Sequence, residues 1–159
     1  MPDTERYIRI MIDSLKKKIE ILDNLLEMNE EQEKAIRESA DLDRFDEIVS
    51  RKSEQIELIK KLDTGFDAVY HRVKPEITGH PELHKEEISQ MQELITLLTD
   101  RSVKMQASEK RNKQLVEQYF SSKRRELRTT KKSVSAASNY YKNMTSTQYV
   151  DAQMINYKQ

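Results

Sequence analysis

The sequence of 159 residues contains no cysteine and no tryptophan, and it has only two glycines and three prolines. Without cysteine, the chain can form neither a disulfide framework nor a thiolate nucleophile. Glycine is too scarce for a phosphate-binding loop and no Ser-His-Asp pattern appears, so we expect no enzyme. Scarce glycine and proline together with 35% charged residues are typical of long helices or coiled coils rather than of a sheet.

The sequence also lacks an excess of charge of either sign and any long hydrophobic run. The formal net charge is zero, so the chain as a whole is not drawn toward nucleic acid or an anionic membrane. No apolar run approaches the roughly 20 residues that span a bilayer. Residues 1–5 are acidic where a signal peptide is basic. These features predict a cytoplasmic protein without membrane insertion.

Hydrophobic residues recur at heptad spacing in the N-terminal part of the chain. One stripe steps alternately by four and three residues, and a second stripe beside it widens the apolar face beyond that of a two-stranded coiled coil. The first stripe consists of Ile8, Ile12, Leu15, Ile19, Leu22, Leu26, Asn29, Glu33 and Ile36, and the second of Ile21, Leu25, Met28 and Ala35. The spacing predicts a helix over residues 5–38 that packs against at least two neighbours.

A second helix is predicted over residues 41–73, with Asp41 as its N-cap. Its apolar stripe ends at Val73. The segment 74–81 follows, with two prolines and a glycine, and carries the strongest loop signal in the chain. Because the connection between the first two helices is only a few residues long, they must run antiparallel.

The third predicted helix, over residues 82–141, contains neither glycine nor proline. At ~1.5 Å per residue it would reach about 90 Å, against about 50 Å for each of the other two. Its last third must therefore fold back after an unmarked break, pair with another copy or await a partner. The predicted fold is an all-α, elongated antiparallel three-helix bundle or coiled coil with a long third helix. It forms a single domain over residues 1–144, followed by a flexible tail over residues 145–159.

Two other sequence features suggest chemistry but favour simpler interpretations. His80, His84 and Glu87 have a metal-like spacing, but surface histidines in a loop and a first helical turn explain them better, so we expect no metal and no cofactor. The chain also contains a basic segment, which we interpret as a solvated face or a protein-docking patch rather than a nucleic-acid site. Its basic residues are Lys123, Arg124, Arg125, Arg128, Lys131 and Lys132.

The C-terminal part of the third predicted helix carries a stripe of apolar side chains that includes several aromatic rings. This stripe fits a bundle core or a homodimer seam, and it also fits a docking face for the amphipathic helix of a partner. Its members are Leu115, Tyr119, Phe120, Leu127, Val134, Ala137 and Tyr141. Four polar residues also fall on predicted seam positions, where they weaken packing and, as a hypothesis, fix the register: Glu33, Lys52, Glu109 and Asn112.

Several segments resemble FlgN-like flagellar chaperones. They are the run over residues 25–36, the cap Asp41 with the residues that follow it, and the apolar continuation of the second helix. In the one-letter code the first run reads LLEMNEEQEKAI. The residues after the cap are Phe45, Ile48 and Lys52, and the continuation is Ile56, Ile59 and Leu62. The resemblance extends to the long third helix and covers most of the chain.

The resemblance implies a cytoplasmic chaperone that binds the C-terminal helices of hook-filament junction proteins, keeps them monomeric and delivers them to the type III export gate. It places client binding in the C-terminal helical region, where the candidates are Leu115, Tyr119, Phe120, Leu127, Val134 and Ala137. For docking to the export gate it implies a tyrosine near the end of the third helix, with Tyr140 and Tyr141 as candidates. The alternatives are a coiled-coil adaptor or dimerisation protein, and a nucleic-acid-associated factor that uses the basic segment.

Overall fold

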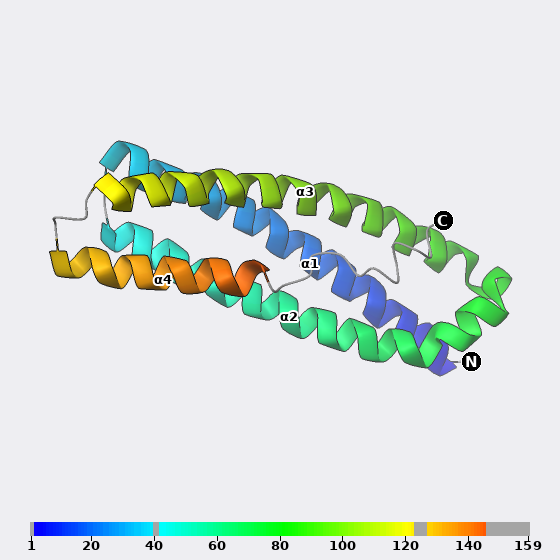
Figure 1. Ribbon diagram of the computed structural model, residues 1–159. Helices are drawn as coiled ribbons and strands as arrows, with labels where there is room; N and C mark the ends of the chain where they lie inside the picture. Colours follow the sequence, from blue (N-terminus) through cyan, green and yellow to red (C-terminus); the bar gives the residue numbers. More distant parts are fainter. Residues whose placement is uncertain (1, 40–41, 123–126, 146–159) are drawn as a thin grey trace.

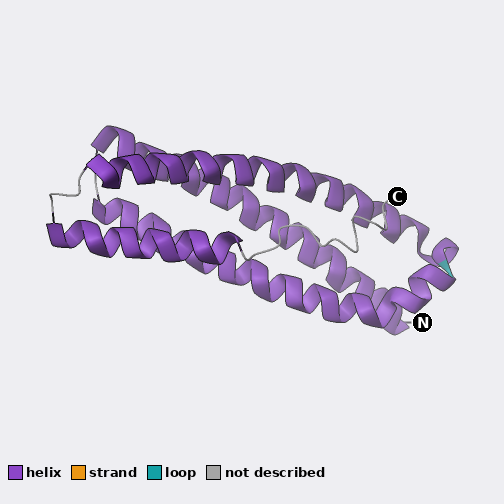
Figure 2. Ribbon diagram, viewed as in Figure 1, coloured by secondary structure: helices purple, strands orange, loops and turns teal. Residues whose placement is uncertain are grey.

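The computed structural model describes residues 2–39, 42–122 and 127–145, and these residues form helices without any strand (Figures 1 and 2). The prediction of an all-α bundle is therefore confirmed. The elements are α1 (Pro2–Lys34), a π-helical turn η1 (Ala35–Ser39), α2 (Leu42–Gly79), a short 3-10 helix η2 (Pro81–His84), α3 (Lys85–Ser122) and α4 (Leu127–Thr145).

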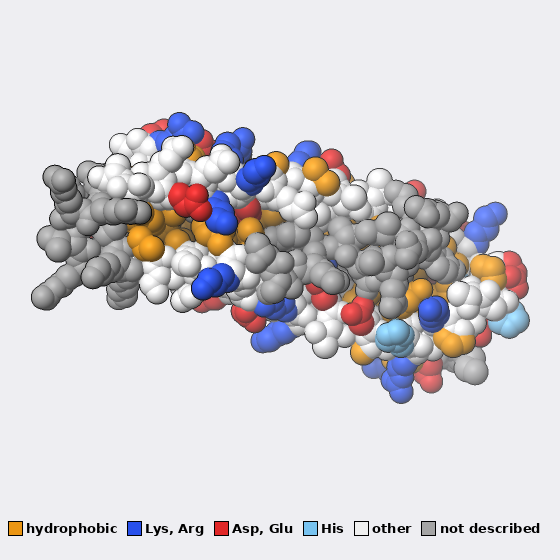
Figure 3. All heavy atoms as spheres, in the orientation of Figure 1, with side chains coloured by type: hydrophobic (Ala, Val, Ile, Leu, Met, Phe, Trp, Pro, Cys, Tyr) orange, Lys and Arg blue, Asp and Glu red, His pale blue; other side chains and the backbone are white. Residues whose placement is uncertain are grey.

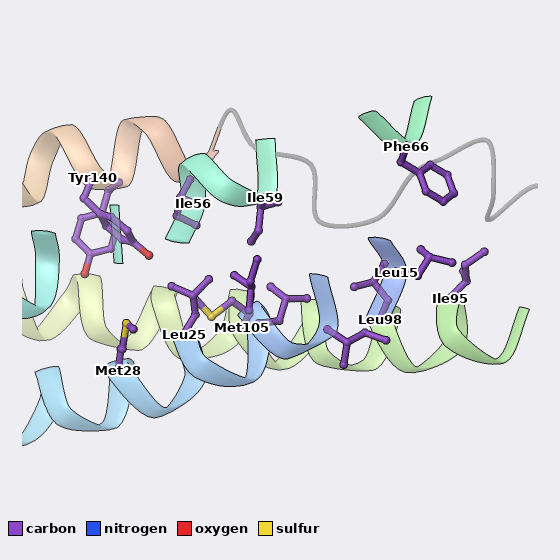
Figure 4. Packing of buried hydrophobic residues seen from close by; sticks show 14 of the residues in the cluster. Leu15, Leu25, Met28, Ile56, Ile59, Phe66, Ile95, Leu98, Met105 and Tyr140 are labelled. Atoms are coloured by element: carbon purple, nitrogen blue, oxygen red, sulfur yellow. The ribbon is translucent and has the colours of Figure 1, made fainter. Parts of the chain in front are cut away.

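The helices lie side by side in an elongated bundle, in which α1 and α3 run in one direction and α2 and α4 in the other (Figure 1). The long helices α1, α2 and α3 extend along the whole bundle. The shorter helix α4 lies along the first part of α2. One continuous cluster of buried hydrophobic side chains fills the centre (Figure 4). Of the first predicted stripe it contains Ile8, Ile12, Leu15, Ile19 and Leu22, and Leu26 and Ile36 pack against it.

The end of α2 differs from the prediction, because the helix continues through the expected loop at 74–81 as far as Gly79. The buried side chain of Ile77 extends the apolar stripe by one further turn beyond Val73. Pro75 cannot donate a backbone hydrogen bond, but this loss falls on an exposed position of the helix. The burial of Ile77 thus outweighs the local loop signal.

The prediction of one unbroken third helix over residues 82–141 is also wrong, and so is the predicted number of three helices. Helix α3 ends at Ser122, and α4 begins at Leu127 and packs mainly against α2. Of the three alternatives for its excess length, the chain folds back on itself. This arrangement buries Ala137, Tyr140 and Tyr141 within the same molecule, and removing apolar surface from water is favourable.

Two predictions fall partly or wholly on residues outside the described part of the chain. The N-cap Asp41 is one of them, although α2 begins at the next residue. The other is the C-terminal tail: Thr145 ends α4, and residues 146–159 are outside the described part.

Candidate functional site

Helix α4 presents one narrow face to the bundle. Ser133, Ala137, Tyr140 and Tyr141 are buried, and their spacing of three to four residues places them on the same side of the helix. Val134 points away and is 40% exposed. Over residues 133–144, the part of α4 whose side chains the structure describes, the inward face therefore combines two small residues with two large rings that carry hydroxyl groups, and the partly buried Met144 packs against the core at its end.

Beneath α4 lies a buried ion pair that joins α2 to α3. Lys52 is 0% exposed and Glu109 is 1% exposed, and the lysine Nζ lies 2.9 Å from Oε1 of the glutamate. Lys52 Nζ also donates a hydrogen bond of 2.7 Å to Oε1 of Gln32, which comes from α1. Burial lowers the pKa of Lys52 more than the Glu109 carboxylate raises it. A buried pair of this kind contributes little net stability, because both ions lose their hydration.

The two tyrosines of α4 complete this polar layer, and Figure 4 shows the ring of Tyr140 directed from α4 toward α3. Tyr140 donates a hydrogen bond of 2.6 Å from its hydroxyl to Oε1 of Glu109, and the Tyr141 hydroxyl accepts one of 3.2 Å from Gln32 Nε2. Lys52 Nζ lies 4.3 Å from the centroid of the Tyr140 ring, which is a cation–π distance. Burial raises the pKa of Tyr141. All four helices thus meet around one charged pair.

A second polar contact lies beside this layer, between α1 and α3. Asn29 Nδ2 donates to Ser108 Oγ over 2.9 Å, and Asn112 Nδ2 donates to the backbone oxygen of Asn29 over 2.9 Å.

Of the four polar residues predicted on the seam, Lys52, Glu109 and Asn112 are buried. Glu33 differs, because it is partly exposed and pairs with Arg37 at 3.0 Å.

Polar contacts with α2 fix α4 near both of its ends. Ser133 Oγ donates a hydrogen bond of 2.9 Å to Oδ2 of Asp46. Further along the helix, Asn143 Nδ2 donates over 2.8 Å to Oε1 of Glu57, and Lys60 Nζ donates to Oδ1 of the same asparagine. These contacts set the register of α4 on α2.

Figure 3 shows hydrophobic side chains along the seam between α3 and α4, where the two helices make few contacts.

The structure brings the α3 and α4 parts of the predicted client-binding stripe to the same end of the bundle. Phe120 is buried and packs edge-on against Phe45 of α2, with ring centroids 5.7 Å apart. Tyr119 and Leu115 are half-buried on α3. Ala137 is buried and Val134 is exposed, as described above, and the side chain of Leu127 lies outside the described part.

The tyrosines proposed for gate docking, Tyr140 and Tyr141, are both buried. Gln32 and Ser133 also belong to this site, and neither was predicted from the sequence. The position of Gln32 directly before the predicted seam residue Glu33 is the one sequence feature that could have indicated its burial.

The remaining candidates are the residues with a metal-like spacing and the basic segment. His84 is buried against the last turns of α2, with Nε2 3.8 Å from Oε1 of Glu76, so its assignment as a surface histidine is wrong. The short helix η2 turns this side chain inward. Within the described ranges no group of three histidine or acidic side chains could hold a metal ion. Residues 123–126 of the basic segment lie outside these ranges, and so do the side chains of its other members.

None of the helices in the described part combines the length and the apolar character needed to cross a membrane. A protein-family model described as FlgN protein matches residues 1–148, which includes every described helix. No curated protein and no solved structure matches the chain.

Proposed function

The chain belongs to the FlgN family, a family of flagellar export chaperones rather than of enzymes, and from this membership we propose a specific client and destination. The protein binds the C-terminal helices of hook-filament junction proteins, keeps these proteins monomeric in the cytoplasm and delivers them to the type III export gate. The basis for a client site is the position of α4, which packs along the first part of α2 beside the C-terminal part of α3 (Figure 1). The surface that α4 covers, called the seat below, includes Asp46, Lys52 and Glu57 of α2 and Glu109 of α3.

In this proposal, the client helix takes the place of α4. The seat accommodates one amphipathic helix. In the part of α4 whose side chains the structure describes, residues 133–144, the apolar side chains directed at the bundle are Ala137, Tyr140, Tyr141 and the partly buried Met144. Phe120 reaches α2 from α3 through its ring contact with Phe45. Leu115 and Tyr119 follow Ser108 and Asn112 by seven residues and therefore lie on the side of α3 that faces α1. A client helix with a wider apolar face would bury more surface there, worth roughly 25 cal/mol for each Å² removed from water.

The client must also overcome the advantage of a covalently attached competitor. Attachment gives α4 an effective concentration on the order of millimolar at its own seat. The narrow face of α4 offsets this advantage, whereas the cost of holding the ion pair between Lys52 and Glu109 out of water applies equally to α4 and to the client helix. A client helix of ordinary amphipathic character can then compete with α4.

Docking to the gate through Tyr140 or Tyr141 belongs to the same proposal. Both side chains face the bundle in the structure, so a partner reaches them only when α4 has left its seat. The α4 residues Leu127, Val134 and Ala137 of the predicted client-binding stripe move with them. In this order of events, the client is bound first and the tyrosines are presented afterwards.

A reversible lock on α4 tests the proposal. Ser133 and Asp46 face each other with a hydrogen bond of 2.9 Å, and the chain has no cysteine, so Asp46→Cys with Ser133→Cys allows a single disulfide. We expect the C-terminal segment of a hook-filament junction protein to bind the reduced variant as it binds the wild type. Calorimetric titration should show at least tenfold weaker binding to the oxidised variant.

The single variant Ser133→Cys is the matched control, since oxidation cannot close a bond within one molecule. Equal binding by the oxidised and reduced double variant would place the client elsewhere on the bundle. A segment that binds neither the wild type nor the reduced variant would contradict the proposed client.

A further inference from the structure

We infer that the buried pair Lys52 and Glu109 selects the helix that binds in the seat: this helix must bring a neutral hydrogen-bond donor, best a tyrosine, to the Glu109 carboxylate. The inference rests on the proposed function, because it concerns the chemistry of the client helix that replaces α4. It assigns a specificity role to two residues that lie beneath the seat rather than at its rim.

The hydrogen bonds around the pair show what the incoming helix has to replace. Glu109 accepts a hydrogen bond of 3.1 Å from Lys52 at Oε2 and one of 2.6 Å from the Tyr140 hydroxyl at Oε1, and Lys52 Nζ lies 2.9 Å from Oε1. The Tyr140 ring covers the ammonium group on the side of α4, at 4.3 Å from Nζ. When α4 leaves, water can reach both groups. When a purely apolar helix then covers them, Glu109 loses both the hydroxyl and the water, which is costly for a charged acceptor.

Charge restricts the donor to a neutral side chain. A carboxylate at the position of the Tyr140 hydroxyl would lie at hydrogen-bond distance from Glu109 and repel it. A lysine or arginine there would approach Lys52, whose Nζ already lies 2.9 Å from the same carboxylate. Serine, threonine, asparagine, glutamine, neutral histidine, tryptophan and tyrosine remain, and of these tyrosine and tryptophan also supply an extended aromatic ring to the ammonium group. Tyrosine fits best because a tyrosine hydroxyl is the donor that Glu109 accepts in the structure.

The rest of the α4 face defines the spacing around this donor. Ser133 and Ala137 precede Tyr140 by seven and three residues, and all three are buried against the bundle. Small side chains at these two positions allow α4 to approach α2 closely. A client helix that runs in the direction of α4 therefore carries small residues seven and three positions before its hydroxyl-bearing residue.

The test pairs substitutions in the client with substitutions beneath the seat. The probe is the recombinant C-terminal segment of a hook-filament junction protein, in which each neutral polar residue of the apolar face is replaced in turn by an apolar residue of similar shape, such as Tyr→Phe or Thr→Val. Each segment is titrated into the full-length wild type and into the full-length variant Lys52→Met with Glu109→Leu. This variant removes both charges together, so neither is left unpaired.

We expect one client substitution to weaken binding to the wild type at least tenfold, since sites built to hydrogen-bond a hydroxyl reject analogues that lack it. The same substitution should change binding to the double variant less than twofold. The matched control is Lys18→Met with Asp63→Leu, which removes another ion pair, of 2.7 Å between α1 and α2. This control should keep the tenfold loss.

The inference is overturned if no client substitution costs more than twofold with the wild type, or if the loss persists in the Lys52→Met and Glu109→Leu variant. In both cases the unmodified segment still binds, so the proposed function stands. An unmodified segment that fails to bind the wild type overturns the proposed function and this inference together. If circular dichroism shows that the double variant is unfolded, the single variant Glu109→Gln replaces it, because it keeps the shape of the side chain. The client substitution should then weaken binding to Glu109→Gln at least threefold less than it weakens binding to the wild type. An equal loss of affinity with both proteins would overturn the inference.

Discussion

The variant Glu109→Leu tests the energetics of the polar layer, because it removes the carboxylate that is paired with the fully buried Lys52. An unpaired ammonium group at this position must stay charged in a dry site or release its proton. Leaving one partner of a buried ion pair behind typically costs ~3–5 kcal/mol. Glu109 also accepts a hydrogen bond from the Tyr140 hydroxyl, and the loss of this bond to a charged acceptor adds ~1.5–3 kcal/mol.

Lys52 can release its proton instead of staying charged, so the free energy of deprotonation is the most that the unpaired charge can cost in stability. The unfolded chain holds Lys52 at the ordinary lysine pKa of 10.5, so at pH 7 deprotonation spans 10.5 − 7 = 3.5 pH units, or about 5 kcal/mol at 1.36 kcal/mol per unit. The limit falls to about 2 kcal/mol at pH 9. When Lys52 is neutral in the folded variant and protonated in the unfolded chain, stability rises with pH up to 10.5.

Urea unfolding followed by far-UV circular dichroism at pH 7, 8 and 9 measures this effect. We expect Glu109→Leu to lose several kcal/mol at pH 7 and to recover part of the loss as the pH rises. The variant Lys52→Met with Glu109→Leu should show no pH slope and should lack the charge part of the loss, because it leaves no buried charge. Only the cost of the lost Tyr140 hydrogen bond should remain. Because α4 covers Lys52, Glu109→Leu can also relieve part of the cost by detaching α4 from the bundle, which would speed hydrogen exchange of the α4 amides. If Glu109→Leu keeps both the stability of the wild type and its hydrogen-exchange protection in α4, the reasoning is refuted.

Three further substitutions probe the same region by urea unfolding. Tyr140→Phe should cost ~1.5–3 kcal/mol, as expected for a hydrogen bond to a charged acceptor, and a loss below about 0.5 kcal/mol would contradict the contact. Burial raises the pKa of Tyr141 above its ordinary value of 10.0, so its contribution to stability is fully present below pH 10 and lost as the pH rises further. Tyr141→Phe should remove this part of the alkaline decline, and an unchanged pH profile would contradict the burial. Phe45→Ala should cost ~3–5 kcal/mol through the cavity it leaves beside Phe120, whereas the exposed control Val134→Ala should stay within about 0.5 kcal/mol, and equal losses in the two variants would contradict the assigned burial.

The sequence predicted the helices well where their apolar stripes face the core. The stripe from Ile8 to Ile36 lies in or against the hydrophobic cluster, and the polar seam residues Lys52, Glu109 and Asn112 are buried as their heptad positions suggested. Local loop signals were less reliable. Pro75 and Gly79 favoured an earlier end of the second helix, but the burial of Ile77 keeps the chain helical.

The boundary between α3 and α4 could not be predicted, because the heptad spacing continues from Val116 through Leu127 to Tyr141 without glycine or proline. One continuous helix and two helices that fold back satisfy the same pattern. Only contacts with α2 decide between them, and these depend on residues far apart in the chain, such as Asp46 with Ser133 and Glu57 with Asn143. The seat that α4 occupies within the same molecule was therefore missed, and client binding by the predicted stripe stays a prediction.

Amide hydrogen exchange on the full-length protein, with and without the C-terminal segment of a hook-filament junction protein, tests most directly whether the client takes the place of α4. Exchange rates report local opening of individual helices. We predict that the amides of residues 133–144 exchange at least tenfold faster when the client segment is bound, while those of the α1 core remain protected. Unchanged or increased protection of residues 133–144 in the complex would contradict the account.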